Sequence, residues 1–349
     1  MNNKIDILSM SIDELIEFMD KMGEKKFRAK QIYGWLHEKR VASFAEMTNI
    51  SKALQDKLAA TCNIATLHEV KKLESKDGTI KYLFELHDHH VVESVLMSYK
   101  HGNSVCISSQ VGCRMGCKFC ASTIGGLKRH LTVSEMLGQV YEMNRISGKR
   151  ISNIVIMGTG EPLDNYDVLV KFIKIINSEE GMNISQRNIT VSTCGIIEKI
   201  YELADENFKI TLAISLHAPN NSVRKKMMPI AEVYGYSLLI EACKDYVKKT
   251  KRRITFEYSL VDGVNDSIYC ARELSKVLKG ILCHVNLIPI NQVEERNYRH
   301  SKRETIIAFK NILEKHKIPT TIRRELGSDI DAACGQLRRS YTKNENKEV

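Results

Sequence analysis

The sequence predicts an α/β fold, in which a partial (β/α)6 barrel follows a small N-terminal helical domain and a β-ribbon. Three observations predict it. Strand-like and helix-like segments alternate six times after residue 104, the preceding residues instead contain helical and hairpin patterns, and hydrophobic residues make up 43% of the chain. Six units are too few to close an eight-fold barrel, so we expect an open, curved sheet.

The first hundred residues predict helices and then a ribbon. Ser11 and Glu14 have the spacing of a capping box before an apolar-periodic helix. Alternating residues on either side of a short polar segment predict a β-hairpin. The expected helices cover 15–22, 28–39 and 52–60, and the expected hairpin strands cover 80–86 and 91–97. We therefore expect a helical domain over 1–65 and a ribbon or linker over 66–103.

The strand–helix alternation then indicates parallel strands joined by right-handed crossovers. The expected strands cover 105–108, 153–157, 188–192, 209–216, 254–260 and 284–289, with a possible edge strand at 320–323. The expected helices cover 133–147, 165–177, 196–206, 237–249, 267–279 and 303–316. Residues 104–340 thus form the barrel and a C-terminal loop. The polar residues 341–349 are expected to be a disordered tail.

Charge and cysteine content restrict the function. The formal net charge is +10, and basic clusters along the chain favour a nucleic-acid partner, although the usual nucleic-acid module motifs are missing from the sequence. No apolar run approaches the roughly 18 residues of a membrane span, and the N-terminus lacks the apolar core of a signal peptide. Ten cysteines in such a chain predict a cytoplasmic protein with metal or thiol chemistry. We expect a monomer.

Cys113, Cys117 and Cys120 carry the most specific signal. Their CxxxCxxC spacing after the first expected strand can supply three ligands to a [4Fe–4S] cluster, which leaves one iron open for a small molecule. Structural zinc requires four ligands, and no second Cys pair or His pair lies nearby in the sequence. The spacing is typical of radical S-adenosylmethionine (SAM) enzymes, whose open iron binds SAM. A zinc site or a set of unligated core cysteines is the alternative.

Polar residues gather where the expected strands end, which is where α/β folds bind ligands. After the second strand, Gly160 lets the backbone approach a ligand and Glu161 can accept a hydrogen bond from an ammonium group. Hydroxyl, imidazole and amide groups follow later strands, namely Ser192, Ser215, His217 and Asn291. The alternatives are a plain glycine-rich turn and a structural histidine.

Two further cysteines are candidates for chemistry. Cys334 lies between small residues in Ala-Ala-Cys-Gly, which would let its sulfur enter a crowded site. Cys106 lies on the first expected strand, where a free cysteine is more often a core residue. The remaining cysteines are interpreted as core or surface thiols: Cys62, Cys194, Cys243, Cys270 and Cys283.

Several segments occur in the order found in the RlmN/Cfr family of radical SAM RNA methyltransferases, which the chain resembles over about residues 25–340. They are Cys106-Ile-Ser-Ser-Gln-Val-Gly-Cys113, Gly-Thr-Gly160-Glu161-Pro-Leu, Val-Ser192-Thr, Ser215-Leu-His-Ala-Pro-Asn220, Gly263-Val-Asn-Asp266, His284-Val-Asn-Leu-Ile-Pro289 and Asp331-Ala-Ala-Cys334-Gly-Gln-Leu337. Gly-Glu-Pro-Leu and the Arg323–Arg324 pair resemble the RlmN branch. Two residues depart from the family pattern. Thr159 stands where the family often has Met, and Cys194 stands where it often has Ser. These differences put only local packing in doubt.

The resemblance implies a radical SAM barrel that methylates carbon-2 of one adenosine in 23S rRNA, in the peptidyl transferase centre, and of the adenosine 3′ to the anticodon in tRNA. The Cfr branch, which methylates carbon-8, is the alternative within the family. The implied cofactors are a [4Fe–4S] cluster and SAM, and the implied partners are 23S rRNA, tRNA and an electron donor such as flavodoxin or ferredoxin. The N-terminal helices are implied to help hold RNA.

The resemblance also implies residue roles. A first SAM methylates Cys334, and a second yields a 5′-deoxyadenosyl radical that takes hydrogen from this methyl group before the carbon adds to adenine. Glu93 on the expected ribbon accepts the carbon-2 proton, and Cys106 then attacks the Cys334 sulfur, leaving a disulfide. Glu93 is equally compatible with a solvent-facing strand position. The implied SAM contacts are Gly160, Glu161, Ser192, Ser215, Leu216, His217 and Asn291.

Two other functions are weighed against this one. The first is a non-catalytic RNA-binding protein with a structural iron–sulfur or zinc site. A structural site needs neither the Cys106–Cys334 pair nor polar strand ends, so these features favour the enzyme. The second is a radical SAM enzyme that acts on a small molecule, which the basic charge and the helical N-terminal domain disfavour.

Overall fold

The computed structural model describes residues 4–345 apart from 101, 291–297, 328 and 331–335. Its helices are α1 (Ile12–Lys21), α2 (Lys26–Gly34), α3 (Lys52–Thr61), α4 (Val133–Ser147), α5 (Tyr166–Ile176), α6 (Ile197–Asp205), α7 (Asn221–Met227), α8 (Tyr236–Thr250), α9 (Ile268–Leu278), α10 (Arg303–Lys315) and α11 (Gln336–Glu345). Its strands are β1 (Ile5–Asp6), β2 (Cys62–Asn63), β3 (His68–Glu74), β4 (Ile80–Glu85), β5 (Val91–Tyr99), β6 (Gly102–Cys106), β7 (Gln110–Gly112), β8 (Leu127–His130), β9 (Ile151–Ile156), β10 (Ile189–Thr193), β11 (Thr211–Ser215), β12 (Ile254–Leu260), β13 (Cys283–Pro289) and β14 (Thr320–Ile322).

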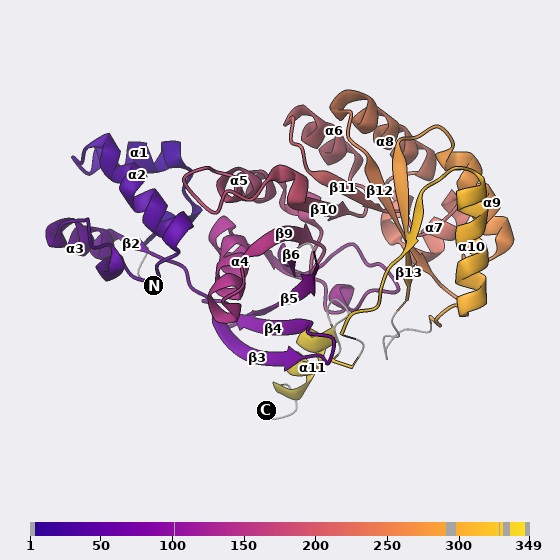
Figure 1. The fold of residues 1–349 in the computed structure, drawn as a ribbon, viewed down its shortest axis with the longest axis horizontal. Coiled ribbons are helices and arrows are strands. Elements are labelled where there is room, and N and C mark those ends of the chain that lie inside the picture. The colour runs from indigo at the N-terminus through magenta and orange to yellow at the C-terminus, as the bar shows by residue number, and fades with distance from the viewer. Residues whose placement is uncertain (1–3, 101, 291–297, 328, 331–335, 346–349) are drawn as a thin grey trace.

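Helices α1–α3 form a separate group at one end of the molecule (Figure 1). The predicted capping box is present, because the Ser11 hydroxyl accepts from the Glu14 amide while the Glu14 carboxylate accepts from the Ser11 amide. Helix α2 continues as a π-helical turn to Lys39 and ends at the left-handed residue Arg40. The parallel pair β1–β2 joins the segment before α1 to the segment after α3.

A buried histidine joins the N-terminal helices to the barrel. The His37 side chain is fully buried, and its Nδ1 lies 2.9 Å from the Tyr141 hydroxyl of α4. Burial lowers the pKa of His37 to about 3, because a charged imidazole would lose its hydration. The contact therefore requires a neutral histidine.

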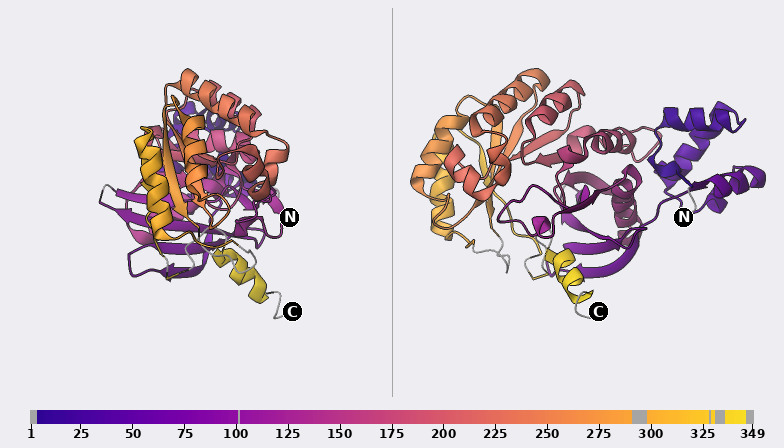
Figure 2. Two further views of the ribbon diagram at one scale, coloured as in Figure 1. Left: turned by 90° about the vertical axis from the view of Figure 1, so that its right-hand side faces the viewer. Right: turned by 180° about the vertical axis from the view of Figure 1, so that it is seen from behind.

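The main sheet has ten strands in the order β14-β13-β12-β11-β10-β9-β6-β5-β4-β3. Strands from β14 to β6 pair in parallel, and β5, β4 and β3 continue the sheet with antiparallel pairing. The sheet curves, with the barrel helices along its convex side (Figures 1 and 2). None of the helices in the described part of the chain has the length and apolar character needed to cross a membrane.

The structure confirms the six predicted strand–helix units and the edge strand β14. Helix α4 covers the predicted residues because a capping box at Thr132 starts it and the left-handed Gly148 ends it. Strand β3, helix α7, the β1–β2 pair and the β7–β8 hairpin were not predicted from the sequence. The predicted strand over 105–108 instead ends at Cys106.

The prediction of a disordered tail from residue 341 is wrong over 341–345, which belong to α11. Leu337 and Tyr341 lie one helical turn apart and pack against Leu83 and Val91 of the ribbon, so this short helix has an apolar face to bury. Residues 346–349 lie outside the described residues. Helix α11 lies beside β4 and β5 in all views (Figures 1 and 2).

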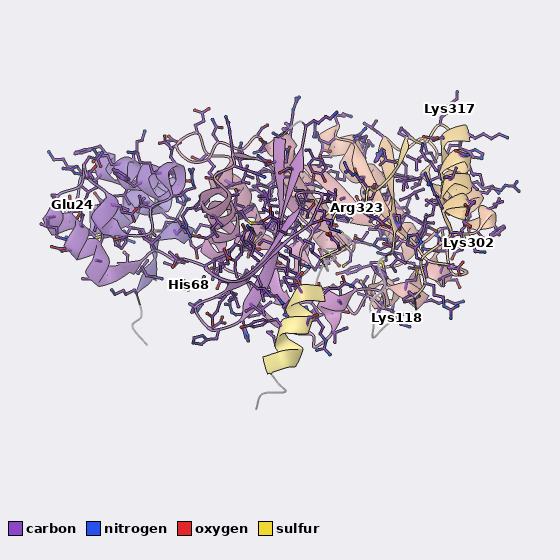
Figure 3. The ribbon with its side chains drawn as sticks, turned by 60° about the horizontal axis from the view of Figure 1, so that its bottom comes forward. Glu24, His68, Lys118, Lys302, Lys317 and Arg323 are labelled. Atoms are coloured by element: carbon purple, nitrogen blue, oxygen red, sulfur yellow. The ribbon has the colours of Figure 1, made fainter. Side chains whose placement is uncertain are left out.

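The buried His37 predicts acid sensitivity. Its folded pKa lies below its unfolded value, so the unfolded chain binds more protons and the free energy of unfolding falls as the pH drops below about 6.5. Between pH 7 and pH 5 this residue accounts for a loss of about 2 kcal/mol. In urea unfolding at both pH values, His37→Gln should lose part of this dependence. The exposed His68 (Figure 3) provides a control, His68→Gln, which should keep it; equal pH dependence in the two variants would contradict the assignment.

Candidate functional site

A cavity of about 240 Å³ lies where the parallel strands end. Most of the predicted site residues line it, namely Cys113, Cys117, Cys120, Gly160, Glu161, Ser192, Ser215 and His217. Leu216 is buried in the adjoining core, and its backbone amide donates to the Glu257 carbonyl. Asn291 and Cys334 lie outside the described residues. The structure thus brings together eight residues that come from four separate segments of the sequence.

The segment 113–126, called the cysteine loop from here on, connects the two strands of a β-hairpin. Strands β7 and β8 pair antiparallel on either side of it, and at Gly112 an added Cβ would lie 2.0 Å from the Gly126 carbonyl oxygen. Inside the loop, the Thr123 hydroxyl donates to the carbonyls of Cys117 and Cys120 at 3.1 and 2.9 Å. The Lys118 amide donates to the Met227 carbonyl at 2.9 Å, which fastens the loop to α7.

The donor set of this loop fits an iron–sulfur cluster. The side chains around the three cysteines are mostly apolar, among them Met115, Met227 and Met228. Burial, together with the nearby Cys120 and Glu161 charges, raises the pKa of Cys113 to about 12, so a cationic group is needed to hold this sulfur as a thiolate. Within the described residues, no three His, Cys, Asp or Glu side chains converge on a position for a single metal ion. The same cavity provides hydroxyl, imidazole and carboxylate groups for the polar parts of SAM.

Glu161 is oriented by backbone amides at the end of β9. Its carboxylate accepts from the Leu163 amide at 3.0 Å and from the Cys194 amide, at the end of β10, at 2.7 Å. Its own amide donates to the Gln110 side chain at 2.8 Å. Burial raises the pKa of Glu161, and these amide hydrogen bonds oppose that effect. The carboxylate is therefore held in one position and can accept a ligand ammonium group.

His217 is held in a strained, neutral form. It has a φ of 54°, which is unusual for a residue other than glycine. The Ser259 amide donates to His217 Nδ1 at 2.9 Å, so the neutral ring carries its proton on Nε2. Burial lowers the pKa of His217 to about 3. The Asn265 side-chain amide donates to the His217 carbonyl at 2.7 Å. The His217 ring packs edge-to-face on Phe119 of the cysteine loop.

The sheet register places Glu93 and Cys106 on the same face as the cavity. Cys106 pairs with Val95 of β5 and with Val155 of β9, and Glu93 lies two residues before Val95. Residues paired in register share a face, and so do residues two apart on a strand. Following the ladders from β9 to β12, the same face carries Ser192, Ser215 and Glu257. These three line the cavity, so this is the concave face of the sheet.

Several cavity residues were missed by the sequence analysis. Glu257 lies within β12, where the Asn286 amide donates to its carboxylate at 2.9 Å. Burial raises the pKa of Glu257, while Asn286 and the Arg323 charge oppose the shift. Arg323, which in the sequence indicated only a family branch, also lines the cavity and lies near the middle of the molecule in Figure 3. Glu257 could have been identified from the sequence, because it is an acidic residue inside an otherwise mostly apolar strand pattern.

Comparisons with known proteins agree with this architecture. A family model described as "Radical SAM superfamily" matches residues 107–269, and one described as "Ribosomal RNA large subunit methyltransferase N-terminal domain" matches residues 5–64. A solved structure of a radical SAM methyltransferase from Sphaerobacter thermophilus superposes with a TM-score of 0.91 at 42% identity, covering 95% of this chain and 98% of that one. The fold and the cysteine loop thus define a radical SAM enzyme, a class whose cofactors are SAM and an iron–sulfur cluster.

Curated relatives identify the family. The chain is 61% identical to the "Probable dual-specificity RNA methyltransferase RlmN" of Lachnoclostridium phytofermentans, over 98% of this chain and 96% of the relative. It is 55% identical to the protein of the same name from Clostridium tetani over the full length of both. The chain therefore belongs to the RlmN family of radical SAM RNA methyltransferases.

The close packing around Gly160 predicts that it cannot be replaced. Its φ of 116° strongly favours glycine, and an added Cβ would lie 2.7 Å from both the Ser109 hydroxyl and the Gln110 Cβ. Gly160→Ala should lower the free energy of unfolding by about 3 kcal/mol, measured by urea unfolding. Gly34→Ala is the matched control, because Gly34 lies within α2 and its added Cβ has room; this variant should be neutral or more stable. If the two variants were equally stable, the prediction that an added Cβ at Gly160 strains the fold would be wrong.

Proposed function

We propose that this chain methylates carbon-2 of an adenosine in the peptidyl transferase centre of 23S rRNA, and of the adenosine 3′ to the anticodon in tRNA. One observation carries the proposal: Glu93 and Cys106 share the concave face of the sheet with the cavity residues. A structural metal site would need neither a carboxylate nor a further thiol on that face. Membership of the RlmN family supports RNA as the substrate.

The cofactor assignment rests on the lining of the cavity and, for Leu216 and Asn291, on the family resemblance alone. We assign Cys113, Cys117 and Cys120 as ligands of a [4Fe–4S] cluster, and Gly160, Glu161, Ser192, Ser215, Leu216, His217 and Asn291 as the residues that hold SAM. When bound, the cluster and SAM supply the one-electron chemistry, which removes hydrogen from a methyl group and takes back one electron from the RNA adduct. An electron donor such as flavodoxin or ferredoxin starts each cycle.

Three side chains of the protein carry the covalent steps. Cys334 accepts a methyl group from a first SAM, and this carbon then joins carbon-2 of adenine, so that protein and RNA become linked. The Glu93 carboxylate takes the carbon-2 proton, which restores the aromatic ring. The Cys106 thiolate attacks the Cys334 sulfur, the bond from sulfur to the methylene carbon breaks, and that carbon takes a proton to become the methyl group. The resulting Cys106–Cys334 disulfide is reduced by an external thiol.

The charge and the N-terminal helices support an RNA substrate. The formal net charge is +10, which favours contact with phosphates. On α2, the Phe27 ring is half exposed, and the Arg28 guanidinium lies 4.8 Å from its centre. An exposed aromatic ring beside an arginine can stack on an unpaired base. We therefore assign these helices to holding structured RNA.

The reaction product tests this function. Reconstituted protein, SAM, reductant and 23S rRNA that lacks the modification should yield 2-methyladenosine, which nucleoside mass spectrometry detects. The same reaction with unmodified tRNA should give the same nucleoside. Formation of 8-methyladenosine would move the enzyme to the carbon-8 branch of the family, and absence of any methyladenosine would exclude both activities.

The two cysteine roles predict opposite behaviour of two variants. Cys106→Ala should accumulate a covalent protein–RNA adduct, because the thiolate that releases the RNA is missing. Cys334→Ala should form no adduct, because the methyl carrier is missing. Denaturing gels of single-turnover reactions measure the adduct. Normal turnover by Cys106→Ala would show that this residue does not release the RNA.

A further inference from the structure

The concave face of the ribbon contains a buried ion pair between Glu93 and Lys81, and Lys81 has no part in the steps above. Lys81 Nζ lies 3.1 Å from Glu93 Oε2, and the two side chains are 0% and 4% exposed. Lys81 pairs in register with Val95, and Glu93 pairs with Leu83, so the two charges lie diagonally on the same face of β4 and β5. Their neighbours on this face are Leu83, Val91 and Val95.

Helix α11 holds the other carboxylate oxygen. The Arg338 amide donates to Glu93 Oε1 at 2.5 Å, while Leu337 packs on Leu83 and Val91. This amide belongs to the first turn of α11, where backbone amides point toward an anion. The helix also contacts β5 and the turn 121–123 that follows Cys120. Glu93 is thus held between Lys81 and α11, close to the cysteine loop.

Stability alone gives little reason for this pair. Removing two charges from water costs several kcal/mol per ion, and well-packed apolar residues in place of a buried pair are often neutral or stabilising. The surrounding face is already apolar, and so suited to such residues. A general base, in contrast, must be ionised and correctly oriented before the proton arrives. A buried carboxylate meets that condition when a fixed cation lies beside it.

We propose that Lys81 is a positioning residue, whose contact holds the Glu93 carboxylate on the concave face so that it can accept the adenine carbon-2 proton. This proposal rests on the proposed function, in which Glu93 is the base. A carboxylate has about four lone-pair positions, and the contacts from Lys81 and the Arg338 amide use one on each oxygen. The proton leaves carbon-2 and binds a Glu93 oxygen, and the bond electrons return to the adenine ring.

The charged and titratable groups around Glu93 can be named among the described residues. Lys81 and Glu85 come from β4, Arg338, Arg339 and Tyr341 come from α11, and Cys106 comes from β6. Because a cysteine side chain is ionisable, Cys106 has to be removed from any pH experiment on Glu93. The Cys106→Ala variant does this, and it also stops the reaction at the protein–RNA adduct.

The experiment follows the proton step alone. In the Cys106→Ala background, RNA that carries deuterium at carbon-2 of the target adenosine is converted to the adduct in a single turnover. Mass spectrometry measures the loss of deuterium per adduct from pH 5.5 to pH 9, so only correctly folded, loaded protein is counted. Lys81→Met and Lys81→Gln remove the charge, Lys81→Arg keeps it, and Glu93→Gln removes the base. Lys72→Met is the matched control, because Lys72 pairs with Glu74 at a half-exposed position of β3.

Four results support the proposal together. Glu93→Gln retains deuterium at every pH. Lys81→Met and Lys81→Gln lose it slowly at pH 7, and the rise of their rates shifts to higher pH by about 1–3 units, as expected when a cation next to a buried carboxylate is removed. Lys81→Arg and Lys72→Met behave as the parent does. Rescue of the Lys81 variants at high pH is a result that a merely structural role would not give.

Other results overturn it in distinguishable ways. If Glu93→Gln is blocked but the Lys81 variants keep the parental pH profile, Glu93 is the base and Lys81 does not position it. If Lys81→Met and Lys81→Gln form no adduct, or are slowed equally at all pH values, Lys81 is a structural residue. If Glu93→Gln loses deuterium as the parent does, the base assignment itself is wrong and the role of Lys81 is excluded with it.

Discussion

The site depends on the register of strand β6, which joins the two kinds of pairing in the sheet. On one side β6 pairs antiparallel with β5, and on the other it pairs in parallel with β9. Because side chains alternate between faces with a period of two, a slip of one residue in either ladder would turn one set of side chains away from the cavity. The positions of Cys106 and Glu93 relative to Ser192 therefore follow from backbone hydrogen bonds that lie outside the cavity. A catalytic face assembled in this way is as rigid as the sheet that carries it.

The two faces of that sheet differ in chemistry because they have different neighbours. On β12, Phe256 and Tyr258 are fully buried in the main core, while Glu257 between them lines the cavity. The polar groups of the concave face largely satisfy one another, since Asn286 donates to Glu257 and accepts from the Thr321 hydroxyl. The helices provide the apolar burial that stabilises the fold. The concave face is then free to hold charges that an ordinary core would exclude.

The sequence predicts these features to different degrees. The residues at the strand ends, such as Glu161 and Ser192, could be placed together because parallel strands bring their carboxyl ends to one edge. Lys81 could not be recognised as buried, because its alternating strand pattern is the same for a face covered by water and a face covered by α11. Contacts between residues that are far apart in the sequence determine which side of the ribbon α11 covers. The roles of Cys334 and Asn291, which lie outside the described residues, remain predictions from resemblance.

The β7–β8 hairpin around the cysteine loop has a consequence for how the enzyme is assembled. In zinc fingers the metal itself gathers the ligands, so binding free energy and folding free energy are the same quantity. Here the hairpin, the Thr123 hydroxyl and the contact with α7 already bring the three thiols to one cavity, so most of the entropy of closing the loop is lost when the chain folds. The three thiols are therefore gathered by contacts that the protein itself makes.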